Sequence, residues 1–194
     1  MKYSVILVSL IGSAQSATPV AAWSGGPAYD MHYHKSSGKL MWDVTVPSGM
    51  WFAMVFGDNM SGNDAVAFVG ANSGGNNGDT EDLWLSGNYA PSKDTTNNYS
   101  PTAAVTFASN VYTFKTQRAL DTGDSKDFKV ECGKTYNWKW VGNSSSSSTS
   151  AKHNKSGSYT FATNADCSAK NVSGASALAI STITAASLIA AQYL

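Results

Sequence analysis

Apolar and polar residues alternate with a period of two along much of the chain. In the segment KLMWDVTV, residues 39–46, every even-numbered position from Leu40 to Val46 is apolar. Asp43 and Thr45 lie between these positions and should face the opposite side. The same alternation recurs in four later segments, at 111–115, 128–131, 134–142 and 158–163. Because successive side chains of a strand point to opposite faces, this period predicts half-buried β-strands.

Two segments are apolar at both odd and even positions, MWFAMVF at 50–56 and AVAFVGA at 65–71. We expect them to be central strands that are covered on both faces. Further strands are predicted at 29–34, 82–85 and 103–107, which brings the total to about ten. Many short strands separated by polar turns favour an all-β fold, an antiparallel β-sandwich of the immunoglobulin-like kind.

The start of the chain has the layout of a secretory signal peptide. Lys2 precedes an apolar run from Val5 to Ile11, and small residues follow at Ala14 and Ser16. The apolar run is too short to span a bilayer. We therefore predict a signal peptide at 1–16, with cleavage next to its last residue, and an extracellular location.

The end of the chain resembles a signal for attachment of a GPI anchor. Small residues at 173–176 are followed by an uncharged tail from Ala177 to Leu194. A retained membrane helix is the alternative, but the tail is weakly apolar and lacks a cytoplasmic Lys or Arg. We predict a β-sandwich domain at 17–167 and a GPI-attachment signal at 168–194 that is removed on maturation. The lipid anchor would hold the domain on the outer face of the plasma membrane.

Composition and cysteine usage agree with secretion. The chain has 13 basic and 13 acidic residues and 13% charged residues, with no basic patch of the kind that binds nucleic acid. Cys132 and Cys167 are expected to form a disulfide, since their wide spacing fits no metal-binding knuckle. Five sequons for N-glycosylation occur, at Asn59, Asn98, Asn143, Asn154 and Asn171.

Several motifs stand in an order that resembles the DOMON domain family. The most specific are Met60-x-Gly62-x-Asp64-Ala-Val and the run RALDTGD that begins at Arg118. The aromatic segment YNWKWVG and a lone His153 follow. The resemblance runs from about residue 29 to residue 163 and implies a secreted β-sandwich. That family is related to the cytochrome domain of cellobiose dehydrogenase and to the N-terminal module of dopamine β-monooxygenase.

The resemblance also implies a cofactor. In the haem-binding branch of the family, a Met in the first motif and a His near the C-terminal end ligate a b-type haem. Carried over, these ligands are Met60 and His153. A His/Met pair suits one-electron transfer. Glycines at 57 and 62 would let the backbone approach the macrocycle. The candidates for the apolar pocket wall are Phe52, Met54, Phe56, Phe68 and Trp140.

Plainer interpretations stay open for the same residues. Met60 alone would be read as packing, and His153 as an exposed residue of a Ser-rich loop. His32 and His34 share a strand face and could hold a metal ion, or simply face solvent. The loop carboxylates Asp121, Asp124 and Asp127 could bind calcium or form a solvated turn.

The sequence shows no nucleophile elbow, phosphate loop or zinc-protease helix, so it gives no reason to expect an enzyme acting alone. The leading hypothesis is a cell-surface haem domain that exchanges electrons with a redox partner protein, a small reductant or a metal ion. The alternative is a non-redox module that binds carbohydrate through aromatics such as Trp84 and Tyr89. A third possibility is a structural coat protein.

Overall fold

The computed structural model describes residues 19–34, 37–72, 78–87, 90–167 and 169–174. The predicted signal peptide at 1–16 and the apolar tail from Ala177 lie outside these residues. In the described part of the chain no helix is long and apolar enough to cross a membrane. Location, cleavage and anchoring therefore stay predictions.

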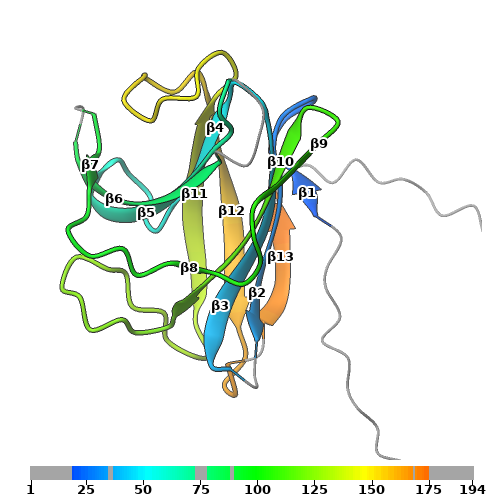
Figure 1. Ribbon diagram of the computed structural model, residues 1–194. Coiled ribbons are helices and arrows are strands. Elements are labelled where there is room, and N and C mark those ends of the chain that lie inside the picture. Colours follow the sequence, from blue (N-terminus) through cyan, green and yellow to red (C-terminus); the bar gives the residue numbers. More distant parts are fainter. Residues whose placement is uncertain (1–18, 35–36, 73–77, 88–89, 168, 175–194) are drawn as a thin grey trace, which may run out of the picture.

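The described residues form two antiparallel β-sheets that pack face to face (Figure 1). The strands are β1 (Val20–Ala21), β2 (Ala28–His34), β3 (Lys39–Pro47), β4 (Trp51–Val55), β5 (Ser61–Val69), β6 (Asp79–Ser86), β7 (Ser92–Lys93), β8 (Ser100–Pro101), β9 (Thr106–Ala108), β10 (Val111–Ala119), β11 (Thr135–Asn143), β12 (Lys155–Thr163) and β13 (Ala169–Gly174). The first sheet has the order β1-β2-β3-β10-β8, with β9 also paired to β10. The second has the order β13-β12-β11-β4-β5-β6-β7. This arrangement confirms the predicted antiparallel β-sandwich.

The strand pattern was predicted well where apolar alternation was long. The segments around 39–46, 111–115, 134–142 and 158–163 are strands β3, β10, β11 and β12. The prediction of a strand at 128–131 is wrong, because that segment belongs to the loop between β10 and β11. Its Val130 amide donates to the Leu120 carbonyl, 2.9 Å away within the same loop.

The expectation that 50–56 and 65–71 are central is confirmed, since β4 and β5 lie in the middle of the second sheet. Their even-numbered side chains, such as Phe52 and Phe68, face the aromatic core between the sheets. Their odd-numbered side chains, such as Ala53 and Ala65, form a second apolar cluster. Both faces of these strands therefore carry apolar clusters, which explains the continuous apolar sequence.

One buried ion pair joins the two sheets. Arg118 of β10 lies 1% exposed and donates from Nη1 to Asp64 Oδ2 of β5, 2.5 Å away. The same guanidinium donates to Tyr99 Oη at 3.0 Å and to the Phe128 carbonyl at 2.6 Å. The Phe128 amide in turn donates to the Asp64 carboxylate at 2.9 Å. Both sheets and the loop between β10 and β11 are thus fastened at one point.

A disulfide holds the end of the β10–β11 loop that lies next to β11. Cys132, just before β11, is bonded to Cys167, just after β12. The prediction of a disulfide rather than a metal pair is confirmed. Beyond it, β13 adds Ala169–Gly174 to the edge of the second sheet, so pairing continues past the predicted boundary at 167.

The ion pair generates a stability prediction. Replacing Arg118 with Met should lower the free energy of unfolding by about 3–5 kcal/mol, because Asp64 is left as a buried charge without its partner. Lys115→Met is the matched control on the same strand, since the Lys115–Asp43 pair at 3.0 Å is exposed. That control should cost at most about 1 kcal/mol. Urea denaturation of both variants measures the difference, and equal losses would contradict this account of the sandwich.

Candidate functional site

A cavity of about 360 Å³ lies on the outer face of the second sheet. We call it the outer-face pocket. Its floor is apolar and comes from four neighbouring strands, with Trp51, Ala53, Val55, Ala65, Leu83, Leu85 and Val141. The opposite wall comes from the β11–β12 connection and the segment before β7, with Thr149, Ser150, Ala151, Lys152, His153, Gly87, Ala90 and Pro91. The volume lies within the range usual for cofactor and small-molecule sites.

Alanine side chains form part of the floor of the outer-face pocket. Ala53 pairs with Ala67 on one side and with Val141 on the other, and Ala65 pairs with Val55. Directly paired residues project on the same face of a sheet, so these side chains lie side by side. Alanine is uncommon in strands, where β-branched and aromatic side chains pack better. The short alanine side chains leave space above the sheet for an apolar ligand.

The loop before β5 places Met60 at the edge of the pocket. Asn63 Nδ2 donates to the Asn59 carbonyl at 3.0 Å, and the Ser61 amide donates to Asn59 Oδ1 at 2.9 Å. Gly62 has φ +68°, a backbone conformation that favours glycine. A Cβ at Gly57 would overlap the side-chain amide of Asn63, so that glycine makes room for the asparagine. These contacts hold Met60 half-buried, with its side chain in the pocket wall.

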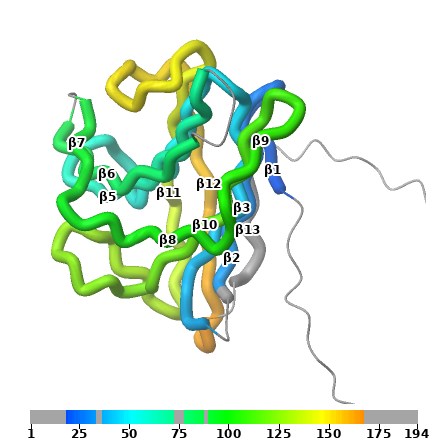
Figure 2. Tube along the Cα trace, viewed as in Figure 1, coloured from blue at the N-terminus to red at the C-terminus, as the bar shows by residue number. Residues whose placement is uncertain are grey.

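The connection between β11 and β12 places His153. The connection is drawn in yellow at the top of Figures 1 and 2. Asn143 Nδ2 donates to the Lys152 carbonyl at 2.7 Å, and the backbone N–H of Asn154 donates to the Gly142 carbonyl at 3.0 Å. His153 is therefore held between two anchored neighbours. Further out, Thr149 Oγ1 donates to Glu81 Oε2 at 2.8 Å and ties the connection to β6.

The structure brings the two predicted ligands to one place. Met60 and His153 both line the outer-face pocket, although 93 positions separate them in the sequence. A second hollow of about 300 Å³ continues past them and shares Met60, Val141 and His153 with the pocket. Met60 and His153 therefore border both hollows.

The predicted pocket wall is largely wrong. Phe52, Met54, Phe56 and Phe68 point into the core between the sheets, away from the outer-face pocket. The floor is made by the alternate residues of the same strands, such as Ala53. Trp140 does lie near the site, because it lines the second hollow. The sequence analysis missed the small residues Ala53 and Ala65, which lie at odd-numbered positions of β4 and β5.

Other candidate residues are placed elsewhere. His32 Nδ1 lies 3.1 Å from Asp30 Oδ2, and this hydrogen bond raises the pKa of the imidazole. The side chain of His34, and Tyr89 as a whole, lie outside the described part of the chain, and Trp84 is half-buried.

Of the loop carboxylates, Asp121 accepts the Gly123 amide at 3.0 Å and Asp124 accepts the Lys126 amide at 2.9 Å. Their side chains thus hold turns.

The sequons differ in how accessible their amides are. Asn59 and Asn154 are exposed. Asn143 is 8% exposed and its Nδ2, where a glycan would attach, donates to the Lys152 carbonyl. Asn98 Nδ2 is buried without a hydrogen-bond partner among the described residues. Asn171 lies on β13. Glycosylation at each of them stays a prediction.

Two solved structures are similar to this fold. One is the cytochrome b domain of pyranose dehydrogenase from Coprinopsis cinerea, with a TM-score of 0.56, 13% identity, and coverage of 70% of this chain and 75% of that chain. The other is the cytochrome domain of Myriococcum thermophilum cellobiose dehydrogenase, with a TM-score of 0.57, 11% identity, and coverage of 81% of each chain. At such low identity the likeness concerns the fold alone. Among curated proteins, none matches this chain in sequence.

A sequence model of one family matches most of the sandwich. The match covers residues 28–143 and carries the description DOMON domain. It includes Met60 and the Asp64–Arg118 pair, and it ends before His153. Since this match spans more than half of the chain, and the fold agrees with it, the protein belongs to the DOMON domain family.

Proposed function

We propose that this domain binds a b-type haem in the outer-face pocket, with Met60 and His153 as axial ligands, and that it transfers single electrons. The observation that carries the proposal is that these two residues line one cavity with an apolar floor. The family and the similar cytochrome domains support it. No enzymatic step is assigned to the domain itself.

The donor set fits haem iron. A neutral imidazole nitrogen and a thioether sulfur together ligate haem in electron-transfer cytochromes, and the thioether raises the reduction potential. The haem, when bound, supplies the reversible one-electron change. The chain supplies orientation and a dry surface. Trp51, Val55 and Leu85 on the floor exclude water from the site, and a low-polarity environment of this kind also tunes the potential.

One charged side chain is placed to meet the polar edge of the cofactor. Lys152 lines the outer-face pocket next to His153 and is exposed to solvent. Apart from His153, the other described lining residues carry no ionisable side chain. A haem carries two carboxylates on one edge, and an ammonium group at the rim can pair with one of them. Lys152 would thus orient the group in the pocket.

The proposed setting is the cell surface. A signal peptide at 1–16 and lipid anchoring near the C-terminus are inferred from the sequence, and the disulfide agrees with an oxidising compartment. Both similar cytochrome domains come from proteins named as dehydrogenases, which supports a redox protein as the partner. A small reductant or an extracellular metal ion could exchange electrons with the same site.

An absorption spectrum tests the proposal directly. The chain, secreted with haem available, should show a Soret band and, after reduction with dithionite, sharp α and β bands of a six-coordinate haem. Met60→Ala and His153→Ala should each abolish the six-coordinate spectrum, because each removes one axial ligand.

The matched controls are Met41→Ala and His32→Ala, which change the same residue types on the first sheet. Both should keep the spectrum of the unsubstituted chain. A folded, colourless protein would contradict haem binding and would favour a non-redox ligand such as carbohydrate. An unchanged spectrum in His153→Ala would contradict the assignment of that ligand.

The anchoring of the His153 loop generates a second prediction. Asn143→Ala removes the hydrogen bond to the Lys152 carbonyl and the acceptor for the Ser145 amide. Loss of such a supporting contact should weaken haem binding roughly 10- to 100-fold. Hydrogen exchange of amides 144–154 should also become faster. Ser145→Ala is the control, since it destroys the same sequon while leaving Asn143 in place. Equal haem affinity in the two variants would contradict the supporting role.

A further inference from the structure

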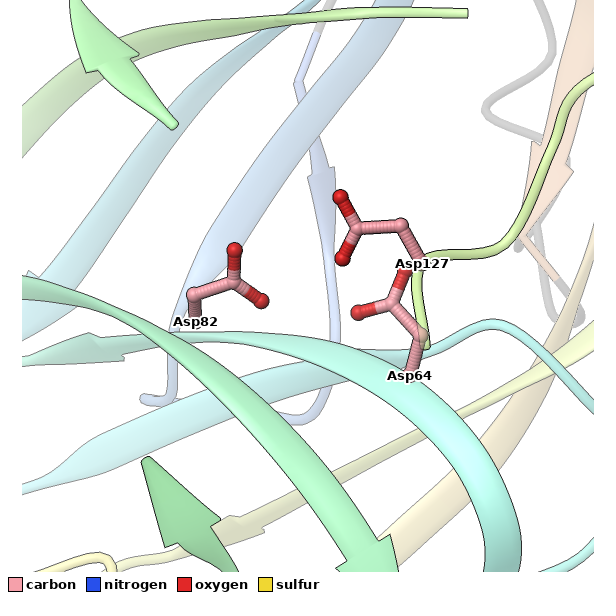
Figure 3. Close-up of side chains that lie close together, drawn as sticks. All are labelled: Asp64, Asp82 and Asp127. Carbon is pink, nitrogen blue, oxygen red and sulfur yellow. The ribbon is translucent and has the colours of Figure 1, made fainter. Parts of the chain in front are cut away.

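Three carboxylates converge on the inner face of the second sheet, on the side opposite the outer-face pocket. Asp64 lies on β5 and Asp82 on β6, while Asp127 comes from the β10–β11 loop. One oxygen from each residue lies within 4.8 Å of the others. Figure 3 shows the three carboxylates turned toward a common space. Asp127 shares its loop with Asp121 and Asp124, but its carboxylate faces Asp64 and Asp82.

In each of these carboxylates one oxygen accepts a hydrogen bond from the protein, and the other accepts none among the described residues. Asp64 Oδ2 accepts from Arg118 and from the Phe128 amide, and Asp82 Oδ2 accepts the Asn98 amide at 2.9 Å. Asp127 Oδ2 accepts the Thr122 hydroxyl at 2.5 Å. All three Oδ1 atoms are buried and lack a hydrogen-bond partner among the described residues. Buried polar atoms are nearly always satisfied, so three in one place indicate a ligand.

The charges of the cluster do not balance. Three carboxylates carry −3 when ionised, and Arg118 is the one cation of the described residues that contacts them, at 2.5 Å from Asp64 and 3.9 Å from Asp127. Asp64 and Asp82 are each only 3% exposed, so water does not screen the remaining −2. A buried uncompensated charge is strongly unfavourable and is normally removed by a proton or a cation. A divalent cation would neutralise this cluster completely.

We propose that Asp64, Asp82 and Asp127 form a calcium site. The donors are oxygens alone, which is the ligand set of hard cations. The three oxygens lie within 4.8 Å of one another, close enough for one ion to contact all three. Calcium accepts several protein carboxylates in flexible geometry, whereas magnesium usually binds through one or two carboxylates and keeps several waters. A set of three protein carboxylates therefore favours calcium.

The site would fasten the β10–β11 loop to the second sheet. Asp127 is adjacent to Phe128, whose amide and carbonyl both contact the Arg118–Asp64 pair. The side chain of Asp127 is 2% exposed, so its carboxylate is buried together with those of Asp64 and Asp82. Met60 and His153 take no part in the cluster, so this site is independent of the proposed haem binding.

Thermal unfolding of the full secreted chain, freed of metal with a chelator, tests the proposal at pH 8. Calcium at about 10 mM should raise the unfolding midpoint by roughly 5–10 °C if the dissociation constant is near 10⁻⁴ M, as in many extracellular modules. Magnesium at the same concentration should give less than half of that shift. Titration calorimetry should give one calcium ion per chain.

The variants Asp82→Asn and Asp127→Asn should lose most of the calcium shift, since each removes a ligand charge. Two variants are used because either could fold poorly. Asp79→Asn is the control on the same strand as Asp82, with a side chain 61% exposed. It should keep the full shift. No shift in the unsubstituted chain, or equal shifts in all three variants, would overturn the site. An equal shift with magnesium would overturn its assignment to a calcium-sized ion.

Discussion

The contact between Arg118 and Asp64 is the constraint on which this sandwich depends. A guanidinium and a carboxylate inside a protein are stable only when they find each other and when their remaining donors and acceptors are satisfied. Here that requirement aligns β10 of the first sheet with β5 of the second, and it draws in Tyr99 and the backbone of Phe128. The rest of the core between the sheets is largely aromatic and aliphatic, and such packing contacts have little directional preference. The ion pair supplies a fixed point from which the neighbouring loop and the acidic cluster are positioned.

The pleat of two strands decides where a ligand can bind. On β4 and β5 the even positions carry the bulky core residues, while the odd positions carry the small side chains of the outer-face pocket. A slip of one residue in β4 would turn Phe52 outward and Ala53 inward, which would fill the pocket and empty the core. The core and the candidate haem site are therefore specified by the same register.

Much of the fold could be predicted from local patterns, whereas the sites depended on other information. Alternation over eight or nine residues predicted β3 and β11, because a helix or a loop rarely produces a period of two over that length. A shorter alternation at 111–115 predicted β10. The same reasoning failed at 128–131, where Phe128 and Val130 pack on the core from a loop. Met60 and His153 were proposed from a family resemblance, and the structure adds that they share a cavity. The convergence of Asp82 with Asp64 and Asp127 was not predictable, since it depends on the register of β5 with β6 and on the course of the β10–β11 loop.

The two sides of the outer-face pocket are attached to the protein very differently. Met60 belongs to a tight turn within the second sheet, but the His153 side is a long strap that crosses the floor and is held by a few side-chain contacts at Asn143 and Thr149. Opening the strap would break those contacts without disturbing the aromatic core or the disulfide. If haem binds there as proposed, the cofactor could therefore be loaded into a sandwich that is already folded and oxidised. Cofactor supply and protein folding would then be separable steps.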